Sequence, residues 1–179
     1  TIWLFHVSGI LGMLYGNSDW FVSATPLNLL ISFVLLLLNS KGHKWFFPMA
    51  FTAFLVGMIS ETLGVQFGWI FGNYQYGEQL GYKVLGVPLM IGVNWAMLTI
   101  ITGAIAHQFY ENTFIRIIIG VALMLLLDLL IEPVAPSLDF WVFEGGEAPL
   151  QNYVGWGVIA LCLQFGYHFL KIKVESGFP

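Results

Sequence analysis

The stretch that decides the fold is WFFPMAFTAFLVGMISETLGVQF, residues 45–67. It runs for 23 residues with a single ionisable side chain, Glu61. A helix needs about 20 mostly apolar residues to cross a hydrocarbon core of about 30 Å, so this stretch predicts a transmembrane helix. Its apolar residues are continuous, whereas a membrane barrel needs alternating segments of about ten residues. A barrel is therefore disfavoured.

Before and after this stretch in the sequence, five more segments consist mostly of apolar residues: 2–14, 21–39, 87–106, 114–131 and 153–170. The first is short, and we interpret it as the remnant of a longer helix or as the successor of one more helix before residue 1. The sequence predicts an all-α integral membrane bundle of about six transmembrane helices. We find no internal repeat, so residues 1–179 are predicted to form a single domain.

The composition excludes several classes of protein. Hydrophobic residues make up 58% of the chain and charged residues only 9%, whereas soluble domains carry about 25% charged residues. A net charge of -4 without a basic cluster argues against nucleic-acid binding. The single cysteine, Cys162, excludes an intrachain disulfide framework and a multi-thiolate metal site. We expect it to lie in the core. No signal-peptide pattern is evident.

Basic residues predict the orientation in a prokaryotic cytoplasmic membrane. If the chain crosses the membrane six times, five of its six Lys and Arg residues fall on one side: Lys41, Lys44, Arg116, Lys171 and Lys173. Because cytoplasmic loops carry an excess of Lys and Arg, both termini are predicted to be cytoplasmic. The segments 67–87 and 133–152 would then lie outside.

Polar side chains from four segments reach one level of the bilayer. Counting 1.5 Å per residue, Glu61 lies about 24 Å and Asp128 about 21 Å from the cytoplasmic start of their helices. Asn94 comes down about 9 Å from the opposite side. Glu132 and Asn152 lie just above that level. Because an ionisable group inside a membrane is costly, this convergence indicates a functional site in the outer leaflet.

The helical faces point these acids inward. Glycines at 57, 64 and 68 share a face with Glu61, where neighbouring backbones can approach closely. Asp128 and Glu132 lie one turn apart, and Pro133 then ends the helix. Burial, the negative helix ends and mutual repulsion disfavour the charged forms, so at least one acid is expected to be protonated at neutral pH.

Structural roles for the same residues stay open at this stage. A single buried carboxyl is as often a hydrogen-bond partner for a loop, and Asn94 and Asn152 could be helix-end caps. Aromatic residues near helix ends commonly form an interfacial belt: Trp95, Trp156, Tyr74 and Tyr76. His6 and His168 are isolated and make no metal-ligand set. No lysine lies in a predicted helix core, which excludes a retinal Schiff base.

Two connections are rich in glycine and aromatic residues. Segment 67–87 contains five glycines, three tyrosines and a tryptophan. Glycine at this density breaks a helix, and aromatic side chains favour the headgroup level. We predict a re-entrant or interfacial loop over the polar layer. Segment 133–152, with Trp141 in the run FWVFEGG, would be the second half of this lid.

Four motifs together resemble the carotenoid hydratase family of integral membrane proteins: ETLGVQFGWIFGNYQYGEQLGYKVLGVPLMIGVNWAM (61–97), DLLIEP (128–133), FW (140–141) and NYVGW (152–156). The resemblance covers roughly residues 50 to 160. Two departures matter. Glu132–Pro133 stands where the family pattern has Asp–Pro, which is conservative. The sequence EAP at 147–149 replaces a Tyr-Gly stretch and leaves the exact carotenoid open.

This resemblance implies addition of water to the terminal isopropylidene double bond of an acyclic carotenoid, giving a tertiary alcohol without a cofactor or metal. Such chemistry needs a proton donor held neutral, a second ionised acid and electron-rich shielding for a carbocation. We predict Asp128 as the acid and Glu61 as the base, with the reverse also open, and Glu132 as a third catalytic residue. The substrate would contact Asn94, Trp95, Tyr74, Tyr76, Trp141, Asn152 and Trp156.

Two alternatives remain. A carotenoid cyclase would begin with the same protonation but exclude water from the cation. A small proton-coupled transporter would use the acids as a relay. The expected partners are an acyclic carotenoid, water and membrane lipid, and the oligomeric state is left open.

Overall fold

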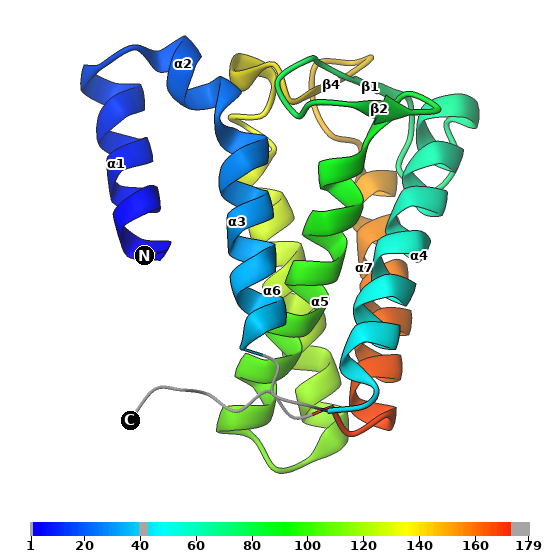
Figure 1. Cartoon of the computed structure of the whole chain (residues 1–179). Helices are drawn as coiled ribbons and strands as arrows, with labels where there is room; N and C mark the ends of the chain where they lie inside the picture. Colours follow the sequence, from blue (N-terminus) through cyan, green and yellow to red (C-terminus); the bar gives the residue numbers. More distant parts are fainter. Residues whose placement is uncertain (1, 40–42, 173–179) are drawn as a thin grey trace.

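The computed structural model describes residues 2–39 and 43–172, which form a bundle of long helices with a small β-structure at one end (Figure 1). The helices are α1 (Ile2–Tyr15), α2 (Ser18–Ser23), α3 (Thr25–Leu38), α4 (Phe46–Phe67), α5 (Leu89–Phe109), α6 (Thr113–Ile131) and α7 (Leu150–Phe169). The short elements are β1 (Tyr74–Tyr76), β2 (Lys83–Val84), β3 (Val87–Pro88), the 3₁₀ helix η1 (Pro136–Leu138) and β4 (Trp141–Phe143).

Local sequence explains where two of the long helices begin and end. Asn112 caps α6, and its side-chain oxygen accepts hydrogen bonds from the backbone N–H groups of Phe114 and Ile115 at 2.8 and 3.2 Å. α4 ends at Gly68, which adopts a left-handed conformation with φ of 67° that glycine accepts without strain. Gly68 therefore ends α4 at the end of the bundle that carries the β-strands, whereas Asn112 begins α6 at the opposite end.

Four stretches in the described residues are long and apolar enough to cross a membrane: Ser18–Leu38, Phe46–Phe67, Leu89–Phe109 and Thr113–Ile131. The predicted six are not confirmed. α1 has 14 residues, or about 21 Å at 1.5 Å per residue. α7 has 20 residues, but it carries buried polar side chains such as Asn152 and Gln164. The predicted single helix over 21–39 is divided between α2 and α3, and Pro26 lies in the first turn of α3.

The helices α4 to α7 pack against one another and contain the most deeply buried side chains, among them Trp95, Met124 and Tyr167. α3 packs against α5, and α1 contacts α2 (Figure 1). The prediction that Cys162 lies in the core is wrong. It is exposed, because it lies on the outward face of α7 beside Leu161 and Phe165.

The two predicted lid segments do approach each other. β1 pairs with β4 in antiparallel register, with Tyr74 opposite Phe143 and Tyr76 opposite Trp141. β2 and β3 form a second small pair. The all-α prediction thus missed four short strands. YQY and WVF are too short to give a recognisable alternating pattern, and they are stabilised by each other across a long separation in the chain.

Candidate functional site

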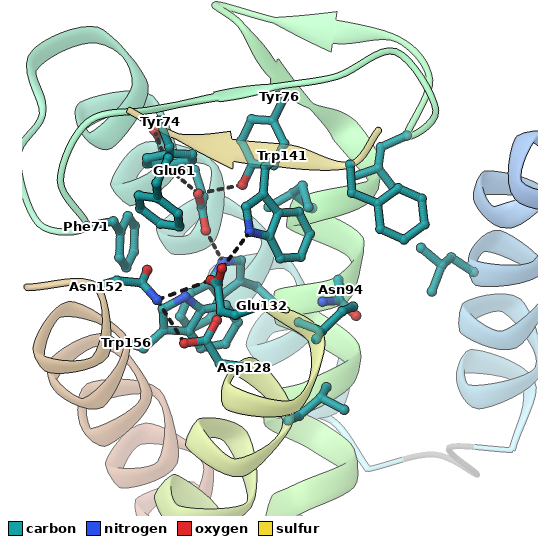
Figure 2. Close-up of a pocket in the computed structure, with 18 of the residues that line it drawn as sticks. Glu61, Phe71, Tyr74, Tyr76, Asn94, Asp128, Glu132, Trp141, Asn152 and Trp156 are labelled. Carbon is teal, nitrogen blue, oxygen red and sulfur yellow. Dashed lines mark hydrogen bonds between the residues drawn. The ribbon is translucent and has the colours of Figure 1, made fainter. Parts of the chain in front are cut away.

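A cavity of about 130 Å³ lies beneath the β1–β4 pair, at the end of the bundle where α4, α6 and α7 meet the capping strands (Figure 2). All ten residues singled out from the sequence line it: Glu61, Tyr74, Tyr76, Asn94, Trp95, Asp128, Glu132, Trp141, Asn152 and Trp156. The volume is larger than one water molecule requires. The structure therefore brings every predicted site residue to one place.

Glu61 receives hydrogen bonds from three side chains. α4 carries it into the cavity less than two turns before the helix ends, and it is 3% exposed. The hydroxyls of Tyr74 and Tyr76 donate to Oε2, the latter at 2.7 Å, and Trp95 Nε1 donates to Oε1 at 2.9 Å. An ionised carboxylate only accepts hydrogen bonds, so a set of three donors matches that form.

The two tyrosines reach Glu61 because they are two residues apart on β1 and so lie on the same face of the strand. Burial, together with the nearby Glu61 charge, raises the pKa of both hydroxyls above the usual value. Tyr74 and Tyr76 therefore remain neutral and act as hydrogen-bond donors throughout the physiological range.

Asp128, Glu132 and Asn152 form the second polar group of the cavity. The Asn152 Nδ2 group donates to Asp128 Oδ2 at 3.0 Å and to Glu132 Oε1 at 3.3 Å. Trp141 Nε1 donates to Glu132 Oε2 at 3.1 Å. Burial raises the pKa of Glu132, which caps the end of α6.

The two deepest acids are in unlike surroundings. Asp128 is 2% exposed, and its Oδ1 atom is buried without a hydrogen-bond partner among the residues described. A buried charged oxygen without a partner is costly, so this environment matches a neutral carboxyl group. Glu61, with its three donors, matches a carboxylate. Two acids whose environments differ in this way can divide the roles of proton donor and proton acceptor.

Aromatic rings form the walls around these acids. Trp95 and Trp156 stack with ring centroids 4.1 Å apart, and Tyr76 meets Trp141 edge-on at 6.2 Å. The faces of such rings attract a cation. Phe71, Phe140 and Phe143 also line the cavity. Phe140 belongs to the FW motif at 140–141, but none of the three was predicted as a site residue. Their proximity to the other aromatic residues of segments 67–87 and 133–152 was the available signal.

The helix-cap interpretation fails for both asparagines. The N-cap positions of α5 and α7 are Pro88 and Pro149. Asn152 instead bridges two carboxyl groups, as described above. Asn94 lies more than one turn inside α5, is half-buried and lines the cavity on the side facing α3 (Figure 2).

Metal binding has no support within the described ranges, where no group of three or more His, Cys, Asp or Glu residues is arranged to hold an ion. His168 is buried in α7 beside Tyr167. The side chain of His6 lies outside the described part of the structure. The same holds for Lys41 and Lys173, on which the predicted orientation partly depends.

Gly57 allows Trp95 to reach Glu61, and this contact gives a test. A Cβ atom at Gly57 would lie 2.5 Å from the Trp95 ring. We expect Gly57→Ala to destabilise the protein by about 1–3 kcal/mol, as overpacking does. The control is Gly157→Ala, whose Cβ would meet only Leu125, at 3.8 Å. It should be neutral or stabilise by up to about 1 kcal/mol. Thermal unfolding in detergent measures both, and equal stability of the two variants would contradict the packing described.

Comparison with known proteins gives two findings. The model of a family described as "Carotenoid biosynthesis protein" matches residues 21–174. Bisanhydrobacterioruberin hydratase from Haloarcula japonica is 31% identical over 131 residues, which is 66% of this chain and 44% of that protein. The match therefore spans less than half of the relative's length. No solved structure matches the chain.

Proposed function

Because the chain belongs to the carotenoid biosynthesis protein family, we propose that it is a membrane carotenoid hydratase. It adds water to the terminal isopropylidene double bond of an acyclic carotenoid and forms a tertiary alcohol. The similarity to a hydratase supports this reaction class. The observation that carries the proposal is the pair of unlike acids in one aromatic cavity. Glu61 receives three hydrogen bonds, whereas a buried oxygen of Asp128 has no hydrogen-bond partner within residues 2–39 and 43–172.

The first step is proton transfer from Asp128. Its neutral carboxyl group protonates the less substituted carbon of the double bond, and the π electrons form the new C–H bond. A tertiary carbocation remains on the neighbouring carbon. The stacked rings of Trp95 and Trp156 stabilise that cation through their π faces. Protonation by a positioned acid is the general acid catalysis that a neutral buried carboxyl provides.

The second step is capture of the cation by water. A carboxylate offers about four acceptor positions, and three are used on Glu61, so Oε1 retains room for one more hydrogen bond. A water molecule held there attacks the cation and transfers a proton to Glu61. The proton later returns to Asp128 through solvent, so that one water is consumed and both acids are restored. Asn152 orients Asp128 through its hydrogen bond, and the nearby carboxyl group of Glu132, when ionised, disfavours the charged form of Asp128 by repulsion.

The substrate reaches the site from the bilayer. We propose that α7 crosses the membrane together with the four apolar stretches, since it packs along α6 and buries most of its polar side chains, among them Asn152, Gln164 and His168. With these five crossings, the C-terminus and the α5–α6 connection would face the cytoplasm and the β1–β4 cap the outside. The N-terminus would share the cytoplasmic side if α1 made a sixth crossing. In a Cys162→Ser background, Glu78→Cys at the cap and Glu111→Cys in the α5–α6 connection should react with an impermeant thiol reagent from opposite sides of the membrane. Reaction of both from one side would refute this orientation.

Expression in a lycopene-producing host tests the reaction. Pigment mass spectrometry should show the carotenoid with the mass of one or two added waters. A product with the unchanged mass but a cyclised end group would identify a cyclase instead. Unaltered lycopene in cells that contain the folded protein would contradict both activities and favour a transporter.

A further inference from the structure

A second hollow lies on the outside of the bundle, between α3 and α5, with a volume of about 790 Å³. Apolar side chains make up seven of its ten lining residues, and Trp3 of α1 lies at its edge. We refer to it as the α3–α5 groove. Pockets that hold small molecules commonly measure about 300–1,000 Å³, so the groove is large enough for a sizeable apolar ligand. The cavity at the acids, at about 130 Å³, is not.

The groove adjoins the acid-bearing cavity. Leu29 lines both spaces, and Thr25, one turn earlier on α3, lines the cavity. On α5, Asn94 lines the cavity and Met97, three residues later, lines the groove. Residues three and four apart share one face of a helix. On each helix, the residues that line the cavity and those that line the groove therefore lie on the same face.

From these observations we propose that the α3–α5 groove holds the polyene chain of the carotenoid whose end group reacts at Asp128 and Glu61. This inference rests on the proposed function for the identity of the ligand. The end group of the carotenoid fits the acid-bearing cavity, and the polyene chain has to extend out of that cavity. The face of α3 from Thr25 to Leu36 spans about 17 Å at 1.5 Å per residue, roughly half of the hydrocarbon thickness of about 30 Å.

The direction of the groove suits a long apolar chain that dissolves in the bilayer. α3 stands at the outside of the bundle (Figure 1), and its Leu27 and Leu30 are exposed outside the groove. A polyene could therefore enter sideways from the lipid along α3 and bring its terminal double bond past Leu29. It would not have to pass beneath the β1–β4 cap.

Retention of lycopene by purified protein tests this site without turnover. The parent is the Asp128→Asn variant, which keeps the cavity but lacks the proton donor. Ile101→Trp fills the groove two turns beyond Asn94, and Leu29→Trp blocks the junction. The matched control is Leu30→Trp, because Leu30 is 43% exposed and lines neither space. Bound pigment per protein is measured by absorbance after gel filtration, with helicity measured by circular dichroism.

We expect Ile101→Trp and Leu29→Trp to retain about tenfold less lycopene than the parent, the scale of steric discrimination in an apolar pocket. Leu30→Trp should retain as much as the parent. Equal retention by a folded Ile101→Trp would overturn the proposal, as would a parent that binds no lycopene. Loss of a bound phospholipid in place of lycopene would assign the groove to lipid and overturn it as well. If the groove dependence is seen but the wild type yields no hydrated product, the hydratase proposal fails and the groove remains a carotenoid site.

Discussion

Replacing Asp128 with Asn should lower turnover by about 10²–10⁴-fold, the range typical for loss of general acid catalysis. The amide is nearly the same size as the carboxyl group, and its oxygen can accept the hydrogen bond that Asn152 donates at 3.0 Å. What the variant lacks is the acidic proton for the double bond. Conversion of an acyclic carotenoid by purified protein, followed by chromatography of the products, measures the effect.

The control for this variant is its folding. Asp128→Asn should unfold at a temperature close to that of the wild type, because the amide keeps the contact with Asn152 and no buried charge is created. A variant that is equally stable and fully active would remove Asp128 from the role of proton donor.

Glu61→Gln should lower turnover by at least about 10²-fold. The amide cannot take a proton from the attacking water. The amide nitrogen would also replace one of the two oxygens that accept hydrogen bonds in the wild type, and so would face either the hydroxyls of Tyr74 and Tyr76 or the N–H of Trp95. Two donors facing each other in a buried site cost stability, so the variant is also expected to unfold more easily.

A matched substitution shows whether the loss of activity is specific to Glu61 or follows from the loss of any carboxylate at this end of the bundle. Glu78→Gln removes a carboxylate from the same end of the bundle, where it pairs with Lys83 and is 84% exposed. It should retain normal activity, because exposed ion pairs contribute little to stability. Equal activity of folded Glu61→Gln and Glu78→Gln would contradict the assignment of Glu61 as the base.

Glu132→Gln should have a milder effect than either change. Glu132 is less buried than Asp128, and both carboxyl groups accept a hydrogen bond from the Asn152 amide. If Glu132→Gln alone abolished activity, the proton donor would have to be Glu132, at the end of α6.

Much of this architecture was predictable because a membrane imposes strong constraints. Continuous apolar runs indicated the helices within a few residues, and the cost of burying a charge singled out Glu61 and Asp128. Glycine spacing gave the correct face of α4, where Gly57 admits the Trp95 ring. The ten predicted site residues meet in one cavity for these reasons.

The remaining features depend on partners that are distant in the chain. The pairing of β1 with β4 joins residues more than 60 positions apart, and no local pattern indicated it. The bridge that Asn152 makes between Asp128 and Glu132 depends on how α7 docks on α6. Likewise, the α3–α5 groove arises from the position of α3 on the outside of α5. α3 is apolar on nearly every side, so its sequence does not indicate which of its faces a neighbouring helix covers.

The most direct test of the hydratase proposal is the incorporation of solvent oxygen. Purified wild-type protein is incubated with an acyclic carotenoid in water enriched in the heavy oxygen isotope, and the pigment is analysed by mass spectrometry. We predict a product that carries one heavy oxygen for each reacted end, in a tertiary hydroxyl group. A cyclised product of unchanged mass, or a hydroxylated product without the heavy isotope, would contradict water addition at this site.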